Sequence, residues 1–179
     1  MDDIARELGM SKKTLYHYIS DKTDLVTRVV DHELKIHTGA MEEIRKVGGN
    51  AVDELIEANR LVHNIRSVHG PSFYFDLRKY YPELFRHWLE EKRHRLYGTM
   101  VENMVKGKKE GLYREEMDEH VIARLYVARM EMFTSSEIID GEESFSGRFI
   151  REVFLYHLHG ISNERGKEYL AGQMERLKL

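Results

Sequence analysis

The sequence predicts an all-α protein with a small N-terminal head followed by a larger helical domain. Only two prolines occur in 179 residues, so long segments run without a helix breaker. No segment shows the sustained alternation of β-branched and polar residues that is typical of a half-buried strand. Glycines and capping residues instead divide the chain into segments of helical length.

Turn and cap residues set the expected helix boundaries in chain order. Glycine ends helices because it adopts left-handed backbone angles, Ser, Asp and Asn cap N-termini through side-chain oxygens, and proline suits a first turn. The expected boundary residues are Gly9, Ser11, Gly48, Asn50, Pro82, Gly111, Asp118, Gly141 and Ser144. The expected helices are residues 2–8, 12–18, 22–46, 51–67, 72–80, 82–109, 119–138, 145–160 and 163–177.

Composition restricts the class of protein. The net charge is −3, so binding to DNA would require a local basic surface. The chain has no cysteine, which excludes disulfides and thiolate metal sites. No apolar run approaches the roughly 20 residues that span a bilayer, and the first residues lack a signal-peptide pattern. We therefore expect a cytoplasmic protein that has no contact with a membrane.

Residues 4–25 carry the strongest functional signal. Two short helices are joined there by a tight turn at Gly9, which predicts a helix-turn-helix. The second helix opens with Ser-Lys-Lys-Thr, so its first turn offers cations, hydroxyls and free backbone N–H groups to a major groove. The residues expected to face inward are Ile4, Ala5, Leu8, Met10, Leu15 and Ile19.

This segment resembles the DNA-binding signature of the tetracycline-repressor (TetR) family. In that signature an Ile-Ala pair precedes Gly, an apolar residue and Ser, and Thr-Leu-Tyr, an aromatic pair, Lys and Leu follow. The matching residues are Ile4, Ala5, Gly9, Met10, Ser11, Thr14, Leu15, Tyr16, Tyr18, Lys22 and Leu25. Ile19 departs conservatively from the Phe that is common in the family. The rest of the chain is similar to the family only in length and helical layout.

The resemblance implies a DNA-binding role for the second helix. Lys12, Lys13 and His17 would face bases, and Thr14, Tyr16 and Lys22 would contact phosphates. Ser11 would cap the helix and add a hydroxyl contact. The alternative interpretation is a short amphipathic helix pair without a DNA role.

The resemblance also implies a further helix ahead of this segment. Family members carry a complete helix of about 20 residues there, and a helix-turn-helix packs its inner face against such a helix. This sequence begins at Met1, directly at the second family helix, so the first family helix is missing from it. We expect the natural chain to start upstream of Met1.

An aromatic segment follows in the larger domain. Residues 73–88 hold seven Phe, Tyr and Trp residues, and ligand pockets are lined by such side chains. The family encloses its inducer site at this position, whereas the alternative interpretation is that the aromatics only fill a core. The predicted pocket comprises Phe73, Tyr74, Tyr81, Phe85, Trp88, Met100, Met104, Met130 and Phe133. Four further side chains could pair with an anionic ligand group or lie satisfied at the surface: His63, His69, Arg78 and Arg129.

The helices expected at 119–138 and 145–160 carry apolar stripes that predict a dimer surface. Two such helices from each subunit would form a four-helix bundle, which is the family's arrangement. The predicted interface residues are Leu125, Met132, Phe149, Val153 and Tyr156. The alternative is that these helices pack only within one chain.

Together these patterns predict a DNA-binding domain over 1–46 and a ligand-binding and dimerisation domain over 47–179. The predicted function is that of a nucleoid-associated, ligand-responsive repressor, which binds palindromic operator DNA as a homodimer and is released by a small-molecule inducer. No phosphate loop, nucleophile elbow or metal-ligand frame is visible, so we expect no enzyme activity, cofactor or metal. The alternative function is a helical small-molecule binding or dimerisation module without DNA-binding activity.

Overall fold

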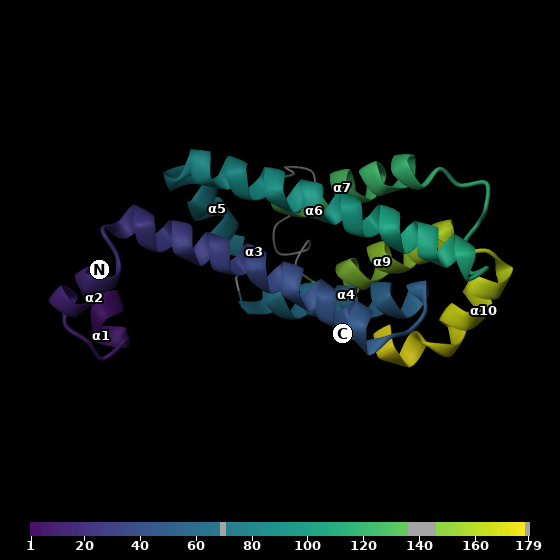
Figure 1. Ribbon diagram of the computed structural model, residues 1–179, viewed down its shortest axis with the longest axis horizontal. Helices are drawn as coiled ribbons and strands as arrows, with labels where there is room; N and C mark the ends of the chain where they lie inside the picture. Colours follow the sequence, from purple (N-terminus) through teal and green to yellow (C-terminus); the bar gives the residue numbers. More distant parts are fainter. Residues whose placement is uncertain (69–70, 136–145, 178–179) are drawn as a thin grey trace. The chain divides into compact units, whose positions relative to one another are not determined.

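The computed structural model describes residues 1–68, 71–135 and 146–177 (Figure 1). Within these ranges the ordered elements are helices, which confirms the predicted all-α class. The chain divides into two compact units, Met1–Thr38 and Gly39–Leu179. Helix α3 (Lys22–Val47) begins in the first unit and ends in the second. The functional boundary expected after residue 46 stays a prediction.

The first unit contains α1 (Asp2–Glu7), α2 (Lys12–Tyr18) and the beginning of α3. Gly9 has a φ of 65°, and this left-handed angle makes the tight turn between α1 and α2. The Ser11 side chain caps α2, because the Thr14 backbone N–H donates to its Oγ at 3.0 Å. Both features confirm the boundaries that the sequence predicts.

The core of the first unit is small and apolar. Its buried members are Ala5, Leu15 and Ile19, and Met1, Ile4, Met10 and Leu25 pack against them. Leu8 takes no part in this core, since its side chain is 57% exposed.

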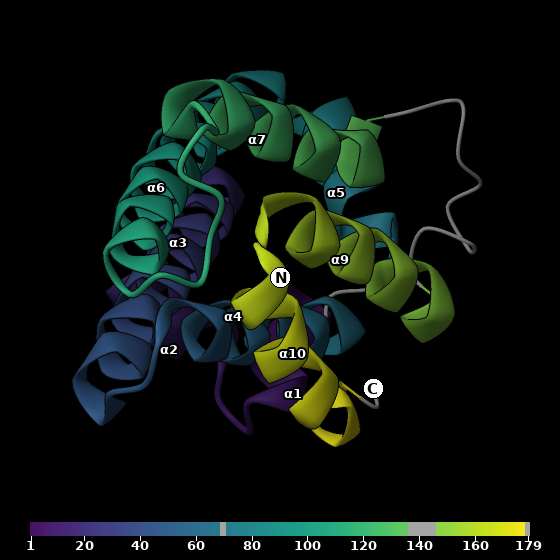
Figure 2. The same ribbon diagram turned by 90° about the vertical axis from the view of Figure 1, so that its right-hand side faces the viewer.

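The second unit is a bundle whose long helix α6 packs against α4, α5 and α7. Viewed from the end, α4, α6, α7 and α9 surround its interior (Figure 2). Its elements are α4 (Ala51–Val68), α5 (Pro71–Tyr80), α6 (Pro82–Lys109), α7 (Glu119–Ser135), α9 (Gly147–Ile161), α10 (Glu164–Gly172) and a 3₁₀ helix, η1 (Met174–Leu177). No helix in the described ranges is long and apolar enough to cross a membrane.

Most helix ends of this unit follow the sequence signals. Asn50 Oδ1 accepts from two backbone N–H groups at the start of α4, and Asp118 Oδ1 does the same at the start of α7. Helix α9 is capped by Ser146, so the expected cap at Ser144 is wrong, and Ser144 itself lies outside the described residues. The segment expected as one helix over 163–177 is interrupted at Gln173, directly after the weak helix former Gly172.

A buried polar network joins α4 to α6 and to the loop after α6. Asn103 donates to the Ala51 backbone oxygen at 2.9 Å and to Glu54 at 3.2 Å, and it accepts from the Tyr113 hydroxyl at 3.1 Å. Lys106 Nζ donates to Glu54 at 2.8 Å. Burial raises the pKa of Tyr113, so its hydroxyl keeps the proton that it donates. The network fixes the N-terminus of α4 against α6 within the core.

Candidate functional site

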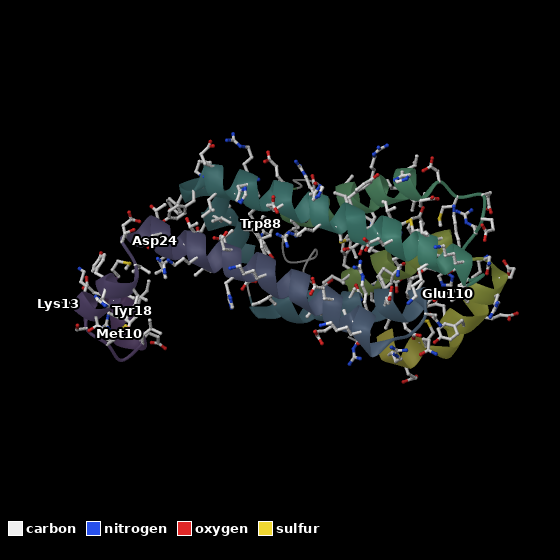
Figure 3. All side chains as sticks on the ribbon, viewed as in Figure 1. Met10, Lys13, Tyr18, Asp24, Trp88 and Glu110 are labelled. Atoms are coloured by element: carbon white, nitrogen blue, oxygen red, sulfur yellow. The ribbon has the colours of Figure 1, made fainter. Side chains whose placement is uncertain are left out.

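The N-terminal turn of α2 presents polar groups to solvent. Lys12, Lys13 and Thr14 are all exposed, and Thr14 Oγ1 lies 2.8 Å from the oxygen of the capping residue Ser11. Figure 3 shows Lys13 at the surface of the first unit. The short cap holds the hydroxyls in place, while the two lysine side chains extend from the first turn. A helix end built in this way offers cations and hydroxyls to phosphates and to base edges.

The charge pattern of α2 runs against the stability of the helix itself. A helix N-terminus carries partial positive charge, so acidic residues stabilise its first turn and basic ones do not. Helix α1 follows this rule with Asp2 and Asp3, whereas α2 has no acidic residue in its first turn and begins with Lys12 and Lys13. Residues that break a local rule without structural compensation are expected at functional positions. A polyanion at this helix end would supply the missing negative charge.

Lys12 has an acidic partner within the same unit. Its Nζ lies 3.0 Å from Asp2 Oδ2, and the hydrogen bond and the charge of Asp2 raise the pKa of Lys12. Both side chains are at least half exposed, so the pair is solvated and weak. Lys12 can therefore exchange this carboxylate for a stronger anion, such as a phosphate.

The remaining predicted DNA contacts lie on the same unit. Tyr16 and His17 are exposed on α2, and Lys22 is the exposed first residue of α3. Tyr18, which sequence reasoning assigned no contact, is 64% exposed and packs edge-on against the His17 ring at 5.5 Å between centroids. The sequence signal for the exposure of Tyr18 was its position next to His17 on α2, because Leu15 already forms the inner face of that helix.

Part of the predicted pocket forms one aromatic cluster. The Trp88 ring lies 5.3 Å from Tyr74 and 5.8 Å from Phe85, and Phe73 packs edge-on against Tyr74 at 5.3 Å, measured between centroids. Lys92 Nζ lies 4.7 Å from the centre of the Trp88 ring. The loop between α5 and α6 brings these rings together, and Trp88 is 3% exposed.

The other predicted pocket residues do not join this cluster. Met100 lies 12 residues beyond Trp88 on α6, about 18 Å away at the helical rise, and Met104 lies one turn further. Both methionines pack in the main core. Tyr81 is half-buried at the N-cap of α6. Met130 lines a hollow between α6 and α7 of about 10 Å³, which has room for about one water molecule. The side chain of Phe133 lies outside the described residues.

A second polar cluster joins α7 to α9. Arg129 Nη1 donates to the Val153 backbone oxygen at 3.3 Å, and the guanidinium carbon lies 4.7 Å from the centre of the Tyr126 ring. That ring also contacts the His157 ring at 4.7 Å between centroids. His157 is 7% exposed, and burial, with a smaller effect from the Arg129 charge, lowers its pKa to about 3. Sequence reasoning proposed Arg129 as an anion partner but did not find His157.

Of the other three side chains considered for an anion, Arg78 is exposed. The side chains of His63 and His69 lie outside the described residues. Within the part of the chain that the structure describes, no three His, Asp or Glu side chains gather as a metal site would require.

The predicted dimer residues divide by exposure. Leu125 on α7 is 63% exposed and Tyr156 on α9 is 79% exposed. Phe149 and Val153 are half-buried on α9, and the side chain of Met132 lies outside the described residues. The large side chains of Leu125 and Tyr156 are therefore not buried within the single chain.

The helix-turn-helix has a counterpart among known families. Residues 1–29 match the family model for bacterial regulatory proteins of the tetR family. This segment is therefore a DNA-binding segment of the tetR type. No curated protein matches the sequence of this chain.

Solved structures resemble the fold of this chain over most of its length. A transcriptional regulator from Cytophaga hutchinsonii ATCC 33406 has a TM-score of 0.68 and 20% identity, with 91% of this chain and 88% of that chain covered. A gamma-butyrolactone receptor (ArpA-like protein) has a TM-score of 0.66 and 12% identity, with 99% and 84% covered. The ketosteroid transcriptional regulator KstR2 of Mycobacterium tuberculosis has a TM-score of 0.60 and 17% identity, with 91% and 84% covered. At these identities the likeness establishes the shared fold.

Proposed function

We propose that this chain is a ligand-responsive transcriptional repressor that binds palindromic operator DNA as a homodimer and is released by a small molecule. The observation that carries the proposal is the exposed N-terminal turn of α2, in which Lys12 and Lys13 stand where a free helix would favour acids. The match of residues 1–29 to the tetR family model supports the same function.

The proposed docking places the first turn of α2 in the major groove. Lys12, Lys13 and His17 reach base edges, where a lysine can donate to guanine acceptors. Thr14, Tyr16 and Lys22 contact phosphates and fix the register of the helix on the duplex. Since the whole chain carries a net charge of −3, this local surface supplies the electrostatic attraction.

Dimerisation supplies the second half-site. We propose that α7 and α9 pair with the same helices of a second copy, through a surface that includes Leu125 and Tyr156, both exposed in the single chain. A two-fold dimer presents two recognition helices about one DNA turn apart, which matches a palindromic operator.

The proposed response to ligand is a population shift within Gly39–Leu179. A small molecule that binds one conformation of this unit more tightly than another changes the operator affinity by that difference in affinity. The structures with a similar fold include a gamma-butyrolactone receptor and a ketosteroid transcriptional regulator, which supports a small-molecule response for this chain.

A salt series tests the DNA part of the proposal. Purified protein is titrated against labelled DNA from its own upstream region and against a random duplex of equal length, with fluorescence anisotropy as the readout. We expect tight binding that is selective for the first duplex and falls steeply with salt. Equal affinity for both duplexes from a dimeric protein would favour the alternative, a small-molecule binding module without DNA-binding activity.

A further inference from the structure

The strongest unexplained feature of the second unit is a group of buried nitrogen atoms without partners. Three of them lie on two neighbouring side chains, as Nε and Nη2 of Arg129 and Nε2 of His157. The other buried side-chain atoms without a partner in the described residues are Asn59 Nδ2, Arg114 Nε and Ser162 Oγ. Leaving a buried donor unpaired is unfavourable, and more so when the group is charged.

The charge of Arg129 has no counter-ion in the part of the chain that the structure describes. Its contacts there are the hydrogen bond from Nη1 to the Val153 backbone oxygen and the uncharged Tyr126 side chain. Burial lowers the pKa of Arg129, the side chains of Tyr126 and Tyr156 oppose this shift, and no carboxylate contributes. Buried charges in proteins are normally paired, so an unpaired one indicates a missing anion.

We infer that Arg129 and His157 bind the carboxylate of a small organic acid that has an apolar body. Nε–H and Nη2–H lie along one edge of the guanidinium and point the same way, which is the fork that binds a carboxylate through two hydrogen bonds. His157 Nε2 adds a third donor in its Nε2–H tautomer. This inference names the ligand class for the ligand response proposed above and rests on that proposal.

The site carries one positive charge, which favours a monoanion. His157 stays neutral because burial and Arg129 disfavour its charged form, so a single carboxylate balances the cluster whereas a doubly charged phosphate would not. The surroundings are apolar, since Tyr126 contacts both partners and Val153 lies alongside. The three nitrogens are sealed in this structure, so binding requires a movement that opens the seam between α7 and α9 (Figure 2). Such an opening would couple the carboxylate to a change of conformation.

The test compares octanoate with octanamide, which has the same chain and no charge. Binding is measured by calorimetry and by the shift of the ¹⁵N resonance of Arg129 Nε–H. This resonance is assigned as the one that is missing from the spectrum of Arg129→Met. We expect octanoate to shift that resonance and to bind about tenfold or more tightly than octanamide, because hydrogen bonds to charged groups are the strong ones. Arg129→Met should lose this preference, while Arg124→Met, which removes an exposed arginine of the same helix, should keep it.

The stability of the unliganded variants separates binding from a structural role. Since Arg129→Met removes an unpaired buried charge, we expect its melting temperature to equal or exceed that of the wild type. A lower melting temperature together with unchanged octanoate affinity would assign Arg129 a structural role and overturn the inference. Equal binding of octanoate and octanamide would also overturn it. The Arg129 Nε–H resonance could instead shift when a dimer is diluted and not when octanoate is added. That result would show that a second copy of the chain supplies the counter-ion, and it would overturn the inference.

Operator binding is measured separately, so that the two proposals can fail independently. Octanoate binding through Arg129 with unchanged operator affinity would leave the carboxylate site standing and remove the proposed ligand response. Selective operator binding by both the wild type and Arg129→Met, without any octanoate binding, would leave the DNA-binding function standing and remove the carboxylate site.

Discussion

In the unit Met1–Thr38 the buried side chains among the described residues are all apolar, and the charged groups lie on the surface. In the unit Gly39–Leu179 Glu54, Asn103 and His157 are buried. The first unit therefore keeps its cations solvated, where the proposed contacts with DNA cost little stability. The second unit buries polar groups, and each hydrogen bond that such a group forms or lacks has a large effect on stability.

The second unit itself contains two contrasting polar clusters. Around Asn103 every side chain has a partner, and the cluster fixes α4 against α6. Around Arg129 and His157 three nitrogens have no partner among the residues that the structure describes. A fully paired network stabilises a fold, whereas an incompletely paired one at a helix seam is the expected position for a ligand group.

The largest expected effect is on the paired network. Asn103→Ala leaves Glu54, the Tyr113 hydroxyl and the Ala51 carbonyl each without one partner, so we expect a loss of about 3–5 kcal/mol in the free energy of unfolding. Urea unfolding at pH 7.5 measures this loss. The control Lys109→Ala alters an exposed side chain of the same helix and should change the free energy by less than about 0.5 kcal/mol. A small effect of Asn103→Ala would show that the network contributes little to stability.

The next effect is the pH dependence caused by His157. Its pKa is about 3 in the folded protein and 6.5 without burial, so below pH 6.5 the unfolded chain binds a proton that the folded chain does not. Stability is therefore fully present above pH 6.5 and decreases as the pH falls toward 3. Between pH 7.5 and pH 5.0 we expect the wild type to lose about 2 kcal/mol more than His157→Gln. His159→Gln, an exposed histidine of the same helix, should follow the wild type.

A smaller effect is expected at the recognition helix, and it concerns binding rather than folding. Lys13→Ala should reduce the affinity for the preferred operator by about tenfold or more while random DNA is affected much less, because the substitution removes a hydrogen bond to a base. The melting temperature should not fall, since Lys13 is exposed and unfavourable to its own helix N-terminus. Lys35→Ala, an exposed lysine of the same unit outside the recognition helix, should preserve the preference. An equal reduction in affinity for both duplexes would place Lys13 on a phosphate instead.

The smallest effect is expected at Lys22. Lys22→Ala should weaken binding to the operator and to random DNA alike, by several-fold, and reduce the slope of log affinity against log salt by about one. Anisotropy titrations at four salt concentrations give both values. Unchanged affinity and slope would remove Lys22 from the phosphate contacts.

The sequence alone determined those features that depend on a few neighbouring residues. Ser11 caps α2 with a hydrogen bond to Thr14, and Gly9 makes its turn by its own backbone freedom. Asn50 and Asp118 also cap their helices through bonds to residues two or three positions away. Most helix boundaries could therefore be predicted to within a few residues. The exposed lysines of α2 could also be predicted, because a spacing of helical turns fixes which face a residue occupies.

Tertiary packing decided where the larger domain places its polar and aromatic groups. Met100 and Met104 entered the main core and not the Trp88 cluster, because a straight helix separates them by several turns. The contact of Arg129 with Val153 joins α7 to a residue 24 positions further along the chain, on α9. Helical periodicity places a side chain on a face, but burial, pairing and the pKa of His157 depend on which distant helix covers that face.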